Sequence, residues 1–392
     1  MPLSDNRNLK VPLHIVYFLS GIATVLIGQI LPILSVNFAL NDLQAGYFFP
    51  SQFAGSLIGT LLTGWFGRRN NFVLATIIGC SAMGIGVIIM GVGILPVCLL
   101  GFAINGFGIG LTLPSTNMLV LEMSPSNSAS ALSVLNFCWG VGAIFCKPFV
   151  DIVTSGSGLL PMTIILAIPL LVLAVYIGFS QRMFDKKPSE AIAVPDSDES
   201  QIPIWTTPMA WAIALFNFIL IGFESGMGGW LTTYAERLHG EPVLRLLSPT
   251  FLFFLFFVIG RGVAPIFFRF LREERVLLLD LGIMLTGMLV ILSTGSLWWL
   301  GVGAAVAGFG SSSVFPTNLS RFTRTFGPTA TRRATPLFIC GTLGATSVTW
   351  LIGFLSNRTG TLQAGMLLLL ACVAALMILQ SVLIIKSVKN SV

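Results

Sequence analysis

The chain has 392 residues, of which 55% are hydrophobic and only 9% are charged. Soluble domains carry about 25% charged residues, so this composition excludes a soluble globular protein. The net charge of +6 could indicate an acidic partner, but the positions of the charges explain it better, as shown below. We therefore expect a lipid bilayer and no nucleic acid among the partners.

Twelve apolar stretches follow one another along the chain, each long enough for a membrane-spanning helix of about 20 residues. We place them, in chain order, near residues 12–36, 44–66, 72–94, 97–121, 130–153, 158–180, 206–235, 248–271, 276–296, 298–320, 334–356 and 361–386. The sequence therefore predicts an all-α membrane protein with twelve transmembrane helices.

The second six stretches repeat the first six at an offset of 201 to 202 residues. The recurring pairs are Gly21 and Gly222, Gly59 and Gly260, Arg68 and Arg269, Asn117 and Asn318, and Gly142 and Gly344. An offset of six spans gives both halves the same orientation, which is typical of transporters built from parallel repeats with a solute site near the midplane. We predict six-helix bundles at 1–180 and 206–392, joined by a polar cytoplasmic linker at 181–205.

The positive charges are unevenly divided between the two sides of the predicted membrane. The side that holds both termini has 16 of the 21 Lys and Arg residues, and the other side has three. Cytoplasmic loops carry an excess of Lys and Arg. We expect a multi-pass protein of the plasma (inner) membrane with both termini in the cytoplasm.

Glu224, in the seventh span, is the strongest functional candidate. An ionisable side chain in hydrocarbon is costly, so it faces a cavity or a partner. In such surroundings a carboxyl group can take up a proton near neutral pH. The competing interpretation is a glutamate that only ties helices together.

Other charged residues fall inside or near the ends of the spans. Lys147 and Asp151 are four residues apart on one helical face, where opposite charges neutralise one another, so a structural pair is favoured over a functional one. Arg261 either balances Glu224 or extends to the membrane surface. Asp280, near the cytoplasmic boundary, has either a gating role or a solvated position.

Amides and aromatic side chains complete the predicted solute site, because they hold hydroxyl-rich solutes by hydrogen bonds and by stacking. Gln29 and Trp230 occupy equivalent repeat positions and form the better-supported pair. The remaining predicted contacts are Asn117, Asn136, Trp139 and Asn217, with Gln52, Asn105 and Tyr234 as further candidates.

The sequence does not favour an enzyme. It has only two histidines, no Gly-rich phosphate loop and no paired carboxylates at metal spacing. We therefore expect no cofactor, no metal and no ATP-driven step, and a monomer that binds a small solute and protons.

Three stretches resemble the major facilitator superfamily, and within it the fucose, galactose and glucose proton symporter branch. They are FLSGIATVLIGQILP, GIGLTLPSTNMLVLEMSP running into LNFCWGVGA, and GFESGMGGWLTTY. The segment GWFGRRNN resembles the superfamily signature, with Arg68 where an Asp is usual. By this resemblance Asn136 falls where the branch has a sugar-contacting Gln, and Asn117 matches a recurrent Asn. The two carboxylates of the fucose permease type would fall at Gly28 and Leu113 and are missing.

Two transport hypotheses follow, together with one of another class. The first is a secondary active transporter that moves a sugar or sugar-like solute by alternating access, with proton coupling at Glu224. The alternative is an exporter or flippase of amphipathic or anionic molecules, favoured by the Phe-rich lining and by Lys147 and Arg261. The third is a sensor or scaffold that binds solute without accumulating it.

Overall fold

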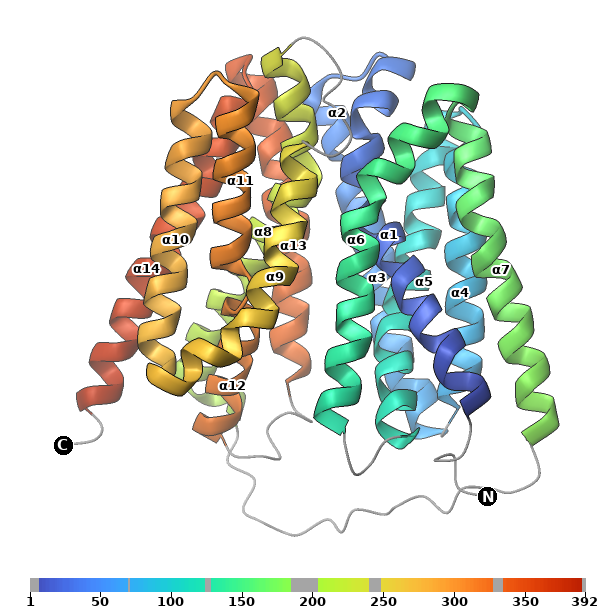
Figure 1. Ribbon diagram of the computed structural model, residues 1–392, viewed down its shortest axis with the longest axis horizontal. Helices are drawn as coiled ribbons and strands as arrows, with labels where there is room; N and C mark the ends of the chain where they lie inside the picture. Colours follow the sequence, from blue (N-terminus) through green and yellow to red (C-terminus); the bar gives the residue numbers. More distant parts are fainter. Residues whose placement is uncertain are drawn as a thin grey trace. The chain divides into compact units, whose positions relative to one another are not determined.

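The computed structural model describes residues 7–69, 71–123, 128–184, 204–239, 248–326 and 334–389, and within these ranges the chain is helical (Figure 1). In chain order the α-helices are α1 (Arg7–Asn37), α2 (Asp42–Gly46), α3 (Phe48–Arg68), α4 (Phe72–Met90), α5 (Leu95–Met123), α6 (Ser128–Ser157), α7 (Leu159–Phe184), α8 (Pro208–His239), α9 (Pro249–Phe270), α10 (Glu273–Ser293), α11 (Leu297–Ser311), α12 (Val314–Phe326), α13 (Thr335–Thr359) and α14 (Gln363–Lys389). The predicted all-α fold is confirmed.

Eleven segments in the described part of the chain are helical, long and apolar enough to cross a membrane, with α11 and α12 forming one of them. The helix α3 covers most of the predicted second span but is not among the eleven. Its 21 residues include Ser51, Gln52 and Ser56 together with several Gly and Thr residues, which lower its hydropathy. The chain is therefore an integral multi-pass membrane protein.

The chain forms two compact units. The first contains residues 1–27 and 50–201, and the second contains residues 28–49 and 202–392, so the helix α1 contributes to both. Within the first unit α4 packs against α5 and α7, and α6 packs against α5 and α7.

In the second unit the helix α8 packs against α13, and α11 packs against both α9 and α10 (Figure 1). The short helix α2 packs on α13, and α14 packs on α10 and α8. The first and last helices of this unit outside α1 are thus both held against its long helices.

The same close helix contact occurs in each unit. A β-carbon on Gly142 would lie 1.9 Å from the carbonyl oxygen of Phe18, and one on Gly344 would lie 1.9 Å from that of Phe218. Only glycine lets backbones approach this closely. The repeat found in the sequence at Gly142 and Gly344 thus corresponds to equivalent helix contacts in the two units.

The predicted linker at 181–205 lies largely outside the described residues. The helix α7 ends at Phe184, and the chain is described again from Ile204, where a short 3₁₀ helix (Ile204–Thr206) precedes α8.

Candidate functional site

The tenth predicted span is interrupted in the second unit. The helix α11 ends at Ser311, and α12 begins at Val314, with Ser312 and Ser313 in a turn between them. We call residues Ser311–Ser313 the serine break. All three side chains are at most 2% exposed.

Serine side chains can satisfy backbone groups and so compete with the helical hydrogen-bond pattern. The hydroxyl of Ser312 donates to the carbonyl oxygen of Phe309 at 2.6 Å. The carbonyl oxygen of Ser313 accepts from the Thr317 hydroxyl at 2.7 Å. The interruption is local, since the Ser312 backbone keeps right-handed helical angles (φ −58°, ψ −41°). Three consecutive buried hydroxyl groups nevertheless make the serine break a polar position inside the unit.

Glu224, on α8, contacts the serine break directly. The hydroxyl of Ser311 donates a hydrogen bond of 3.2 Å to Oε1 of the Glu224 carboxyl group. The Glu224 side chain is half-buried. The strongest candidate from the sequence is therefore held at the interruption of a neighbouring helix.

Arg261, on α9, contacts the next serine. Its Nε donates to the carbonyl oxygen of Ser312 at 3.3 Å, and its guanidinium carbon lies 4.2 Å from the centre of the Phe257 ring. A cation over an aromatic face is stabilised by the ring quadrupole. A β-carbon on Gly260 would lie 2.3 Å from the Ser312 hydroxyl oxygen, so glycine is needed for α9 to approach this closely.

The charges of Glu224 and Arg261 interact electrostatically. In the described part of the chain, however, no direct ion pair joins them; the ion pairs found there are Lys147–Asp151, Arg237–Asp42 and Arg324–Glu273. Arg261 can balance an ionised Glu224 at a distance, while Ser311 can hydrogen-bond to the carboxyl group in either protonation state.

Gln29 and Trp230 both lie in the second unit, and both are engaged with protein groups. Oε1 of Gln29 accepts from the Thr232 hydroxyl at 2.9 Å. The indole N–H of Trp230 donates to the carbonyl oxygen of Thr349 at 2.9 Å, and its ring packs at 5.7 Å from that of Phe49. Both side chains are at most 2% exposed, so their contacts are those of helix packing.

The two predicted asparagines on span interiors also bridge helices. The amide nitrogen of Asn217 donates to the carbonyl oxygen of Leu337 at 2.9 Å, while its amide oxygen is buried without a hydrogen-bond partner. Oδ1 of Asn117 accepts from the Tyr17 hydroxyl at 2.9 Å. The structure therefore brings neither of them to the serine break.

The remaining predicted residues lie on α6, in the first unit. Lys147 and Asp151 form the predicted ion pair at 2.7 Å, with the Lys147 side chain 5% exposed. The indole nitrogen of Trp139 is buried without a hydrogen-bond partner. Asn136 is exposed, and its amide nitrogen donates to the carbonyl oxygen of Leu132 at 2.9 Å.

The structure also explains one departure from the fucose permease pattern. A β-carbon on Gly28 would lie 2.0 Å from the carbonyl oxygen of Gly228 and 2.8 Å from the α-carbon of Gly229. A carboxylate at position 28 would have no room in this arrangement. Any proton-binding carboxyl group must then come from another position.

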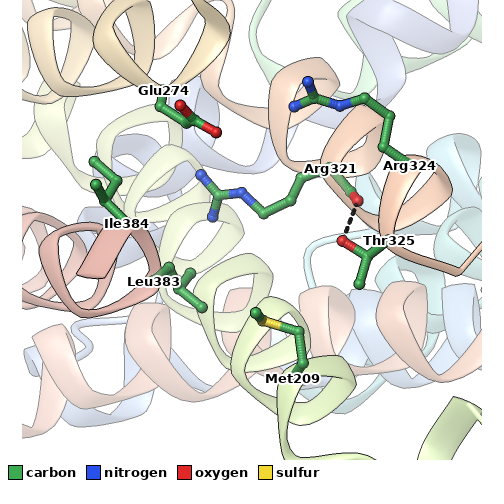
Figure 2. Close-up of a pocket in the computed structure, with 7 residues that line it drawn as sticks. All are labelled: Met209, Glu274, Arg321, Arg324, Thr325, Leu383 and Ile384. Carbon is green, nitrogen blue, oxygen red and sulfur yellow. Dashed lines mark hydrogen bonds between the residues drawn. The ribbon is translucent and has the colours of Figure 1, made fainter. Parts of the chain in front are cut away.

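A cavity of about 190 Å³ lies near one end of the second unit (Figure 2). It is lined by residues that the sequence did not single out: Met209, Glu274, Arg321, Arg324, Thr325, Leu383 and Ile384. In Figure 2 the Arg321 guanidinium extends into the space between Glu274 and Leu383, and its Nη2 donates to Oε1 of Gln380. The cavity is amphipathic and separate from the serine break.

The serine break itself was missed by sequence reasoning. The signal was present as three consecutive serines in GFGSSSVFP, inside an otherwise apolar span. Interrupted hydrophobic segments mark binding sites in transporters, but serine is common enough in transmembrane helices that the run alone does not predict a break.

The comparisons with known proteins agree with this fold. Residues 13–338 match the Major Facilitator Superfamily. The chain is 21% identical over 314 residues to an uncharacterized MFS-type transporter of Yersinia pestis. The aligned region covers 78% of each protein.

Similar solved structures include several transporters. The nucleoside transporter NupG has a TM-score of 0.74 at 14% identity, covering 96% of this chain and 98% of that one. A peptide transporter POT in complex with sulfate has a TM-score of 0.76 at 15% identity, covering 99% and 95%. The E. coli fucose:proton symporter FucP has a TM-score of 0.61 at 18% identity, covering 96% and 98%. At these identities the likeness shows the fold alone.

Eleven apolar spans and an internal repeat are typical of a multi-pass transporter. The chain belongs to the Major Facilitator Superfamily, because the sequence model of that family matches most of its length. The fucose symporter branch is not specifically supported, because nucleoside and peptide transporters are also among the similar structures.

Proposed function

We propose that the chain is a secondary active transporter for a small polar solute of the sugar class, and that Glu224 carries the coupling proton. The bundles at 1–180 and 206–392 rock by alternating access. The protein works as a monomer. Both of its termini lie in the cytoplasm, an orientation that the distribution of Lys and Arg supports.

The single observation that carries the proposal is the Glu224 carboxyl group at the serine break. An intramembrane carboxyl group is retained where it serves an ion or solute pathway. Ser311 supplies a hydrogen bond, and Arg261 supplies a balancing charge without forming a direct ion pair. The group can therefore be neutral in one state and charged in the next, as a coupling site requires.

The solute class rests on two side chains of α6 and on the similar transporters. The buried, unpartnered indole N–H of Trp139 and the exposed amide of Asn136 lie on α6, one turn apart, and both can bind hydroxyl groups. Two of the structurally similar proteins are transporters of molecules that contain a sugar ring. One is a nucleoside transporter and the other is a fucose:proton symporter. Sugars and nucleosides are therefore the first solutes to test.

The test is uptake of radiolabelled fucose, galactose, glucose and uridine into proteoliposomes, with and without an inward proton gradient. We expect at least one solute to accumulate only with the gradient, and Glu224→Gln to lose that accumulation. The matched control is Glu273→Gln, which changes a carboxyl group that pairs with Arg324 outside the site, and which should accumulate solute like the wild type.

Two results would contradict the proposal. If no sugar or nucleoside is taken up, the solute class is wrong. If Arg261→Ala or Lys147→Ala reduces transport while Glu224→Gln leaves it unchanged, the site handles anions, and the exporter or flippase hypothesis replaces this one.

A further inference from the structure

Asp280 is a second acid next to the serine break, buried where Glu224 is half-buried, and the coupling scheme above does not use it. It lies on α10 and is 7% exposed, so the solvated position left open by the sequence does not apply. The hydroxyl of Ser313 donates a hydrogen bond to Oδ2 of Asp280. Ser311 and Ser313, two residues apart, thus each bind a different carboxyl group.

The position of Asp280 is fixed by close packing. A β-carbon on Gly310 would lie 2.6 Å from the Asp280 carbonyl oxygen and 2.7 Å from the Met284 nitrogen. The backbones of α10 and α11 are therefore in contact directly before the serine break. This contact fixes the Asp280 backbone beside α11, within reach of Ser313.

No cation in the described part of the chain pairs with Asp280. The helix α11, which packs on α10 most extensively, has no titratable residue between Leu297 and Ser311. Ionisable residues of the other helices that pack on α10, and of α10 itself, are Arg321 and Arg324 on α12, Arg261 and Arg269 on α9, Cys372 on α14, and Glu273, Glu274 and Arg275 on α10. The side chains of Lys386 and Lys389, at the end of α14, lie outside the described residues.

Three of the four arginines on α9 and α12 have other partners. Arg324 forms an ion pair with Glu273 at 2.6 Å, and Arg321 donates to Gln380 and interacts with the charge of Glu274. Arg261 donates to the Ser312 carbonyl oxygen. The buried Asp280 carboxyl group thus has a neutral serine hydroxyl as its hydrogen-bond donor.

An isolated buried carboxylate is costly, and such a group is neutralised by a proton instead. We propose that Asp280 and Ser313 form a second proton-binding site, at the other side of the serine break from Glu224. A proton from solvent adds to Oδ1, the oxygen that Ser313 does not engage, and converts the carboxylate to a carboxylic acid. The same proton leaves from Oδ1 when the site ionises.

Both acids hydrogen-bond to serines of the same short segment. The charge of each acid can therefore act on the backbone of the serine break. Loss of a proton from either acid strengthens its hydrogen bond to Ser311 or Ser313, because bonds to charged acceptors are stronger than bonds to neutral ones. A role of the Asp280 site in coupling rests on the proposed function. The existence of the proton site can be tested without transport.

The experiment is infrared difference spectroscopy of the reconstituted protein between acidic and alkaline buffer. A protonated carboxylic acid has a carbonyl band that disappears on ionisation. We expect the wild type to show a band that Asp280→Asn removes and Glu224→Gln leaves in place. A spectrum of Asp280→Asn identical to that of the wild type would overturn the proposal.

Ser313→Ala keeps the test valid if Asp280→Asn does not fold. Removing the hydroxyl should shift the frequency of the Asp280 band, since the hydrogen bond to Oδ2 is lost, and an unshifted band would overturn the proposal. A different carbonyl band that is lost in Glu224→Gln would belong to Glu224 itself. If that variant loses none, the proton role of Glu224 fails while the Asp280 site stands.

Discussion

The two units share a packing scheme but differ at the position of the serine break. Residues 202 positions before Ser311–Ser313 are Ile109, Gly110 and Leu111, and α5 continues through them without interruption. In both units glycines bring the helices into contact before this point: Gly108 approaches Gly79, and Gly310 approaches Asp280. The repeat therefore preserves the scaffold while its chemistry differs between the copies.

The charges follow the same division. In the first unit Lys147 and Asp151 form an ion pair within one helix. In the second, Glu224 and Asp280 stand outside the ion pairs of the described residues and hydrogen-bond to serines. Their counterparts in the repeat are Ala23 and Gly79. A duplicated fold can thus keep one half as a rigid frame and place its protonatable groups in the other.

The largest expected effect tests whether the ion pair of the first unit is only structural. Lys147→Met alone leaves the Asp151 charge without its partner and should lower the free energy of unfolding by about 3–5 kcal/mol. The double variant Lys147→Met/Asp151→Leu should recover most of this loss, because no charge is then buried unpaired. Thermal unfolding of the purified protein measures both.

Transport by the double variant sharpens the same comparison. If the first unit is the frame, the double variant keeps gradient-driven uptake. Loss of uptake at normal stability would show that the pair takes part in transport.

The second prediction concerns Asp42, which lies outside the membrane spans and within the second unit. Burial acts to raise its pKa, but hydrogen bonds from Arg237 and Ser356 and the Arg237 charge outweigh this and hold the pKa below its ordinary value. One bond, from Nη1 of Arg237 to Oδ2 of Asp42, is 2.7 Å long. Asp42→Asn should cost about 1.5–3 kcal/mol, typical of hydrogen bonds to charged groups.

The pH dependence follows from the sign of this shift. Because the folded-state pKa is lowered, the contribution of Asp42 is complete above the ordinary value of about 4 and is lost as pH falls through the lowered value. The melting temperature of the wild type should therefore fall in acid by more than that of Asp42→Asn. Equal acid sensitivity of the two proteins would refute the contribution of this contact.

The third prediction tests whether the two copies depend equally on close glycine contacts. Gly142→Ala and Gly344→Ala each place a β-carbon 1.9 Å from a backbone oxygen, and each should cost about 1–3 kcal/mol by overpacking. Gly282 has open space beside it, so Gly282→Ala should be neutral or stabilise by up to about 1 kcal/mol. Melting temperatures that differ strongly between the first two variants would break the proposed equivalence.

The smallest expected effect distinguishes the serines from one another. Ser311→Ala removes one hydrogen bond from Glu224 and should reduce gradient-driven uptake by about threefold to tenfold, as expected for a single bond. Ser312→Ala is the matched control, because its hydroxyl bonds the carbonyl oxygen of Phe309 on its own helix. Equal effects of the two substitutions would mean that Ser311 has no special relation to Glu224.

The sequence alone predicts the helical fold because its signals are local or periodic. Span length and hydropathy define most of the helices, and the glycine repeat identifies Gly142 and Gly344 as equivalent positions. The pair Lys147 and Asp151 follows from a spacing of four residues on one helix. The hydropathy of α3 is the exception, since its polar residues reduce the signal.

The site was predicted less completely, because hydrogen-bond partners depend on packing between distant segments. Glu224 and Arg261 could be selected by their charge. The satisfied contacts of Gln29 with Thr232 and of Trp230 with Thr349 could not be read from their types, and neither could the binding of Asp280 by Ser313. An amide or indole in a span has the same appearance in sequence whether it faces a solute or another helix.

The central claim is that Glu224 couples proton movement to solute movement, and it is tested most directly by comparing exchange with accumulation in the same proteoliposomes. The probe is whichever of radiolabelled fucose, galactose, glucose or uridine the wild type accumulates. For Glu224→Gln the account predicts that solute exchange across the membrane at equal concentrations continues, while accumulation driven by a proton gradient is lost. Accumulation by Glu224→Gln equal to that of the wild type would contradict it.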